Sequence, residues 1–152
     1  MDPTDKNGDY GYVCSTWVTT ARVLPQFLFA PRETFDRAWY PRVRATLERS
    51  SVVIAADVAD EWHILGFAVA EECGGLPEAV GLLLHYVCVV EQWRGRGIGN
   101  SLLAALGLAA GPIYSTHYNE RAWKERVRYM PSLFRRPKGK HAPAPGLRVS
   151  AR

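Results

Sequence analysis

Apolar and polar positions along the first fifty residues predict one strand followed by a helical segment. Residues 12–20 are rich in Val, Thr, Trp and Tyr, and this composition predicts a first strand. From Pro31 onward, apolar side chains recur every fourth residue, and a proline suits the first turn of a helix. The stripe consists of Phe35, Trp39, Val43 and Leu47. Because Pro41 lies inside this pattern, we expect two short helices or a kink.

Three apolar runs in the middle of the chain predict strands. Residues 51–56 and 64–70 flank a polar turn, so they indicate a hairpin. Residues 81–90 contain almost no polar position, which predicts a central strand covered on both faces. A glycine-rich turn follows at residues 94–99, and the apolar residues 101–109 predict a short helix.

The last predicted elements are a strand at residues 113–117 and an amphipathic helix at residues 119–129, which Pro131 ends. The expected order is therefore β-α-α-β-β-β-α-β-α, with a glycine turn before the third helix. This order is typical of an α/β fold with a mixed central sheet and helices on both of its faces.

Composition agrees with one folded domain. The 152 residues fit a single domain, and the hydrophobic fraction of 47% and charged fraction of 22% are ordinary for a globular chain. We expect a flexible N-terminus at residues 1–10, the folded domain at residues 11–133 and a basic tail containing proline and glycine at residues 134–152. The net charge of +4 comes from that tail, which disfavours nucleic acid as a partner of the domain.

No segment of the sequence indicates export or membrane insertion. The N-terminus is polar and lacks the apolar region of a signal peptide. The longest apolar stretch, residues 81–90, is far shorter than the ~20 residues that a membrane span needs. The three cysteines are widely spaced and show no zinc-ligand pattern. We therefore expect a cytoplasmic protein with no membrane partner and no bound metal.

The glycine-rich turn is the segment with the clearest chemistry, because glycines let successive backbone N–H groups converge on one point. The helix that follows adds partial positive charge, so the turn predicts an anion site, most naturally for a pyrophosphate. A Walker A loop would need Lys-Ser/Thr after its last glycine, where Asn100 stands. The dinucleotide fingerprint needs a different glycine spacing.

The turn resembles the Q/R-x-x-G-x-G/A signature of the GNAT superfamily of acetyl-CoA-dependent N-acetyltransferases. Arg94, Gly97 and Gly99 occupy its three fixed positions. The predicted element order, over residues 12–130, is also similar to that of the family. The chain further resembles small GNAT-like proteins of bacteriophages at residues 12–17 and at Thr116 and His117.

This resemblance implies acetyl-CoA as the cofactor. The backbone N–H groups of the turn would hold the pyrophosphate of coenzyme A; they belong to Arg94, Gly95, Arg96, Gly97, Ile98, Gly99 and Asn100. The backbone of Val87 and Val89, on the preceding strand, would bond the pantetheine arm and the thioester carbonyl. Asn119, at the start of the last predicted helix, would also contact pantetheine.

The resemblance also implies direct attack of a primary amine on the thioester in a ternary complex, which needs a base. The family's usual base position falls on Leu83, so we expect His85, on the same face of the strand, to act instead. A hydrogen-bonded core histidine is the equal alternative. Glu71 and Glu72 are further candidates. His117 could face either the pocket or the core, and we expect it to have a core or structural role.

The family's usual acid position falls on Arg126, so Tyr129, one helical turn further, is the expected acid, with a packing role as the alternative. The acceptor would be a small-molecule amine, a protein lysine or a protein N-terminus. A non-catalytic module that binds coenzyme A or a protein partner is the alternative function. Only 21 residues follow Pro131, so we expect the family's C-terminal hairpin to be reduced or absent. The open sheet edge makes homodimerisation a hypothesis.

Overall fold

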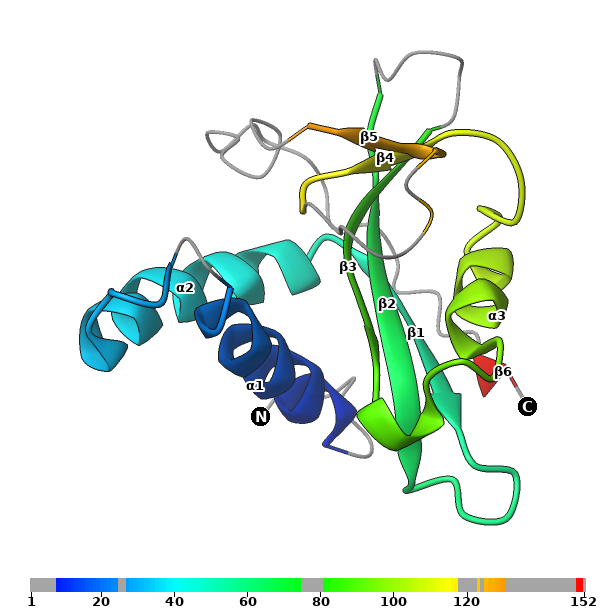
Figure 1. Ribbon diagram of the computed structural model, residues 1–152, viewed down its shortest axis with the longest axis horizontal. Helices are drawn as coiled ribbons and strands as arrows, with labels where there is room; N and C mark the ends of the chain where they lie inside the picture. Colours follow the sequence, from blue (N-terminus) through cyan, green and yellow to red (C-terminus); the bar gives the residue numbers. More distant parts are fainter. Residues whose placement is uncertain are drawn as a thin grey trace. The chain divides into compact units, whose positions relative to one another are not determined.

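The computed structural model describes residues 8–24, 27–74, 81–117, 123, 125–130 and 150–151. The chain divides into two compact units, Met1–Glu48 and Arg49–Arg152. The described part of the first unit is helical, whereas the second unit is built on a β-sheet (Figure 1).

In the first unit, the helix α1 (Asp9–Arg22) occupies the segment for which a strand was predicted, so that prediction is wrong. The buried side chains of α1 are Val13, Cys14, Trp17, Val18 and Ala21. Their spacing follows the helical period of 3.6 residues and forms one stripe. Burial of this stripe outweighs the strand preference of valine, threonine and tryptophan.

The helix α2 (Arg32–Leu47) runs through Pro41 without interruption, so the prediction of two short helices is wrong. Pro41 is exposed, and water can bond the carbonyl that loses its helical donor. The predicted stripe is confirmed, because all four of its side chains are buried. Two of them, Phe35 and Trp39, stack with their ring centroids 5.3 Å apart.

The second unit contains a mixed six-stranded sheet with the order β5-β4-β3-β2-β1-β6. Its strands are β1 (Ser51–Ala56), β2 (Ile64–Glu72), β3 (Leu82–Val89), β4 (Ile113–Ser115), β5 (Val127–Tyr129) and β6 (Ser150–Ala151). The three longest strands are antiparallel, while β4, β5 and β6 join the sheet in parallel. The predicted hairpin of β1 and β2, the central place of β3 and the α/β class with a mixed sheet are confirmed.

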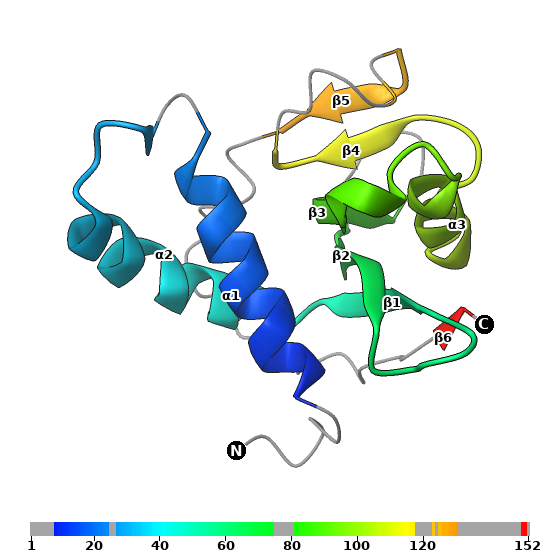
Figure 2. The same cartoon turned by 60° about the horizontal axis from the view of Figure 1, so that its bottom comes forward.

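The helix α3 (Ile98–Ala105) packs on β1, β2 and β3 (Figure 2). Leu102 and Leu103 of this helix are buried in one cluster with Val53, Ala68 and Leu84 of the sheet. The helix begins and ends a few residues earlier than predicted, directly after the glycine turn. Its position places the turn at one end of the central strand.

The prediction of a helix at residues 119–129 is wrong for the last part of that segment. The chain forms β5 there, and Trp123 has a positive φ of 55°, which a right-handed helix does not contain. Asn119 lies outside the described residues, as do the N-terminus before Gly8 and the basic tail apart from β6. No helix within the described ranges is long and apolar enough to cross a bilayer.

Candidate functional site

A β-bulge divides the central strand β3. Ala70 of β2 is paired with Leu84, but its neighbour Val69 is paired with Tyr86, so His85 is the extra residue on β3. The bulge changes which face of the sheet each later side chain meets. Leu84 belongs to the apolar cluster under α3, whereas the next side chain, His85, is hydrogen-bonded to Glu71.

The strands β3 and β4 separate at this bulge. They are paired at Leu83 with Tyr114 and at Leu84 with Ser115. One further backbone bond joins the N–H of Thr116 to Leu84 O, at 3.1 Å. Past this bond, the described residues include no strand on the side of the second half of β3 that faces away from β2, so β3 and β4 form a fork.

The backbone of the second half of β3 offers polar groups to the open side of the fork. The N–H of Val90 donates to Leu65 O on β2. Because backbone polar groups alternate in direction along a strand, the N–H and C=O groups of Val89 and Val87 point away from β2. Arg94 Nε donates to Val89 O at 3.0 Å, which agrees with this direction. The two residues expected to bond pantetheine thus lie on the edge that faces the fork.

The glycine turn follows this edge, after the 3-10 helix η3 (Glu91–Trp93). Gly95 and Gly97 have φ values of 76° and 82°, a backbone region that favours glycine. Gly97 is the N-cap of α3, and the first helical bond runs from Ser101 N to Gly97 O. The preceding N–H groups have no acceptor within the helix; they belong to Ile98, Gly99 and Asn100. These donors at the positive end of the helix suit an anion.

The two arginines of the turn are held by neighbouring groups. The backbone N–H of Arg94 donates to Glu91 O at 3.1 Å, so it is engaged inside the turn. The guanidinium of Arg96 lies over the ring of Trp93, 4.7 Å from its centroid. The backbone N–H groups expected to bind a pyrophosphate ran from Arg94 to Asn100. Because that of Arg94 is engaged, the candidate donors begin at Gly95.

Trp123 covers the first turn of α3. Its Nε1 donates to Asn100 Oδ1 at 2.8 Å. A Cβ atom at Gly99 would lie 3.1 Å from the indole ring, so the absence of a side chain lets the ring pack closely. The last glycine of the signature therefore makes room for Trp123, whereas Gly97 provides the backbone conformation.

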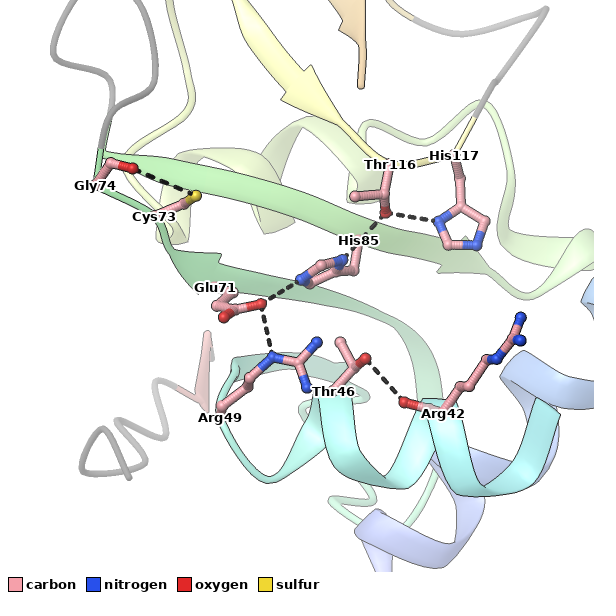
Figure 3. Close-up of polar contacts among 9 residues, drawn as sticks. All are labelled: Arg42, Thr46, Arg49, Glu71, Cys73, Gly74, His85, Thr116 and His117. Atoms are coloured by element: carbon pink, nitrogen blue, oxygen red, sulfur yellow. Dashed lines mark hydrogen bonds and ion pairs between the residues drawn. The ribbon is translucent and has the colours of Figure 1, made fainter. Parts of the chain in front are cut away.

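Polar side chains form a chain of hydrogen bonds at the fork (Figure 3). Glu71 Oε2 lies 2.9 Å from His85 Nε2, and His85 Nδ1 lies 3.1 Å from Thr116 Oγ1. The same Thr116 oxygen lies 3.0 Å from His117 Nδ1. Arg49 Nε donates to Glu71 Oε2 at 3.0 Å. His85 and Glu71, both expected from the sequence, are therefore joined to His117, for which a core or structural role was expected, and to Thr116, which was not a candidate.

Burial and charge set the protonation states of this chain. Burial lowers the pKa of His85, and the hydrogen bond and charge of Glu71 oppose that effect only in part. Burial works to raise the pKa of Glu71, but the hydrogen bond from His85 and the charge of Arg49 outweigh it and hold the pKa below its usual value. Burial and the nearby His85 lower the pKa of His117 to about 4. At neutral pH, Glu71 is a carboxylate and both histidines are neutral.

Tyr129 lies on β5, in register with Ser115, and its side chain is half exposed. The helix that was expected to carry it is absent at this position, so the spacing that made it an acid candidate does not hold. Arg126, at the family's usual acid position, donates to Leu108 O and Gly111 O. These bonds fasten the loop after α3.

The described residues contain no group of three His, Cys, Asp or Glu side chains that could hold a metal ion. Comparison of the chain with models of protein families and with curated proteins finds no match.

Proposed function

We propose that this protein is an N-acetyltransferase that transfers the acetyl group of acetyl-CoA to a primary amine. The observation that supports this most is the backbone edge at Val87 and Val89, which pairs with no second strand among the described residues and runs directly into the glycine turn. An extended thioester arm can bond along such an edge while its pyrophosphate accepts bonds from the turn. One strand and one turn thus suit both ends of the same cofactor, and the resemblance of the turn to the GNAT signature supports the same ligand.

Acetyl-CoA, when bound, supplies an activated acetyl group. The backbone N–H of Val87 is suited to stabilise the negative charge that develops on the carbonyl oxygen during attack by an amine. The N–H groups from Gly95 to Asn100 would neutralise and orient the pyrophosphate. The acceptor is a small-molecule amine or the amine of a protein lysine or N-terminus, and the reaction takes place in the cytoplasm.

A module that binds coenzyme A without catalysis is the second candidate. It is favoured by the residues at the family's usual base and acid positions. Leu83 cannot accept a proton, and the guanidinium of Arg126 is bonded to two carbonyl oxygens. Assays of thiol release with a panel of primary amines separate the two candidates, because only an enzyme releases free coenzyme A in the presence of an amine.

Two variants of Gly97 test the cofactor site. Asparagine and aspartate tolerate a positive φ better than other side chains, and a Cβ at Gly97 meets no atom within 4 Å. Gly97→Asp and Gly97→Asn are nearly identical in shape and differ by one negative charge. We expect the wild type to bind acetyl-CoA in calorimetric titration, Gly97→Asn to retain most of the affinity and Gly97→Asp to lose about tenfold or more. No binding by the wild type, or equal binding by both variants, contradicts the proposal.

A further inference from the structure

A cavity of about 450 Å³ lies beside the helix α3. Its volume is within the range of small-molecule binding sites. The cavity begins at the first turn of α3, which carries the proposed pyrophosphate donors, and extends to the loop that follows the helix. The residues that line it are Asn100, Ser101, Leu103, Ala104, Ala109 and Arg126.

Arg126 brings to this cavity a positive charge that no described carboxylate balances. Its Nε donates to Gly111 O at 2.8 Å and its Nη2 donates to Leu108 O at 2.7 Å. Both partners are neutral carbonyl groups, and the ion pairs among the described residues do not include Arg126. Residues 97–118, which contain α3 and its loop, have no acidic side chain. Because Arg126 is half-buried and has no described counterion, the cavity favours an anionic ligand.

The guanidinium of Arg126 also has a donor group to spare. The two carbonyl bonds use Nε and Nη2, and within the described ranges no acceptor is bonded to Nη1. The same two bonds hold the planar group at the loop after α3. The direction of Nη1 is therefore set before a ligand arrives, which lowers the entropic cost of binding.

Asn100 adds a second donor, at the other end of the cavity. The indole Nε1–H of Trp123 can only donate, so the Asn100 atom that lies 2.8 Å from it is the amide oxygen. The amide nitrogen of Asn100 is then a donor with no acceptor among the residues that the structure describes. The cavity thus has a neutral donor at the first turn of α3 and a charged donor at the loop.

Three adjoining parts of the chain suit the parts of coenzyme A in their chemical order. The backbone edge of Val87 and Val89 suits the thioester arm, and the glycine turn suits the pyrophosphate. Beyond its pyrophosphate, coenzyme A carries a ribose with a 3′-phosphate and an adenine base. The glycine turn leads into α3, and the cavity begins at the first turn of that helix. Its volume suits a small group, and its cation suits a phosphate.

We propose that the cavity beside α3 binds the 3′-phosphate end of coenzyme A and that Arg126 selects for this phosphate. The inference rests on the coenzyme of the proposed function but not on catalysis, so it holds equally for an enzyme and for a non-catalytic module. Arg126 Nη1 donates to a phosphate oxygen, and the guanidinium offsets part of the phosphate charge. Arg126 is thereby the residue that distinguishes coenzyme A from its 3′-dephospho form.

Calorimetric titration with two ligands tests this site. Acetyl-CoA and 3′-dephospho-acetyl-CoA differ only by the 3′-phosphate. We expect the wild type to bind acetyl-CoA about tenfold more tightly, because a hydrogen bond from a guanidinium to a phosphate is charge-assisted. In Arg126→Gln the two affinities should become nearly equal. A loosened loop after α3 would weaken both ligands alike, so the ratio of the affinities reports the phosphate contact.

Arg128→Gln is the matched control for this variant. It removes the same charge two residues away, from an exposed side chain of β5 that does not line the cavity. The affinity ratio of Arg128→Gln should equal that of the wild type. A ratio that falls equally in both arginine variants reflects the net charge of the protein and overturns the role of Arg126.

Two variants of Ala104 test the cavity while the carbonyl bonds of Arg126 stay in place. Ala104 lines the cavity and is exposed on α3, where glutamate and glutamine are good helix formers. The two introduced side chains have nearly the same shape, and only that of Ala104→Glu is a carboxylate that can pair with Arg126. We expect Ala104→Glu to bring the ratio close to one and Ala104→Gln to keep most of it.

The outcomes separate this inference from the proposed function. Equal affinity of the wild type for the two ligands overturns the 3′-phosphate site and leaves the proposed coenzyme site standing. A wild-type ratio that persists in both Arg126→Gln and Ala104→Glu places the 3′-phosphate elsewhere and also overturns the inference. If the wild type binds neither ligand, the proposed coenzyme site fails, and the 3′-phosphate site fails with it.

Discussion

The two halves of β3 differ in their neighbours. Residues 82–85 lie between β2 and β4, and Leu83, Leu84 and His85 are buried. Residues 86–89 are half-buried and, among the described residues, are paired with β2 alone. The bulge at His85 is the boundary between them. Because a bulge re-aims side chains and ends regular pairing, one strand can hold a fixed polar chain in its first half and, among the described residues, leave one edge of its second half without a partner strand.

The polar chain of the enclosed half should make the protein sensitive to acid. The folded pKa of His117, about 4, is below the ordinary value of 6.5, so the unfolded chain takes up a proton first as the pH falls. The contribution of neutral His117 to the free energy of unfolding is complete above pH 6.5 and is lost as the pH approaches 4. We expect His117 to account for a loss of about 3 kcal/mol in the free energy of unfolding, measured by urea titration between pH 7.5 and pH 4.

His117→Asn provides the control for this pH dependence. The asparagine amide can still donate to Thr116 Oγ1 but does not titrate. Its free energy of unfolding should fall less steeply with acid than that of the wild type, although Glu71 and His85 still contribute in the same direction. Parallel curves for the two proteins would show that His117 titrates normally in the folded state.

A substitution at Gly66 should act mainly on the open half. A Cβ atom there would lie 2.6 Å from Cys88 O and 3.2 Å from Val89 Cα, so Gly66→Ala must push β2 and β3 apart. In the part of the chain that the structure describes, no second strand pairs with β3 at this point. We expect a loss of about 2 kcal/mol in the free energy of unfolding, with hydrogen-exchange protection falling more at residues 86–89 than at residues 82–84.

Gly74→Ala is the matched control, because a Cβ at Gly74 meets no atom within 4 Å. It should leave the free energy of unfolding nearly unchanged. If Gly66→Ala lowers hydrogen-exchange protection equally at residues 82–84 and 86–89, the two halves of β3 open together, and the difference in their strand pairing does not affect their local stability.

Elements with a local signal could be predicted from the sequence. Continuous apolar runs identified β1, β2 and β3, and glycine spacing identified the turn before α3. For α1 the composition of valine, threonine and tryptophan was misleading. The helical period of Val13, Trp17 and Ala21 was present in the same residues and would have predicted the helix.

The polar chain had no comparable local signal. His85 is 14 residues from Glu71 and 31 residues from Thr116 along the chain. Their meeting depends on the bulge in β3 and on the register of β4, neither of which a hydrophobic pattern specifies. The prediction that Tyr129 lies on a helix was wrong for a related reason. The parallel pairing of β5 with β4 outweighs the helical pattern of that segment.

The smallest effect is expected where the glycine turn meets Trp123. Trp123→Phe keeps an aromatic ring over Gly99 but removes the donor to Asn100 Oδ1, an exposed bond that water can replace in part. The free energy of unfolding should fall by about 1 kcal/mol or less, and Trp62→Phe, at a ring that is two-thirds exposed, should change it even less. A bond this weak matters because it fixes the first turn of α3, whose N–H groups are the proposed pyrophosphate donors. Calorimetry should therefore show a larger change in acetyl-CoA affinity than in stability. If the acetyl-CoA affinity of Trp123→Phe equals that of the wild type, the glycine turn keeps its conformation without the indole hydrogen bond. Trp123 then only shields the first turn of α3 from solvent.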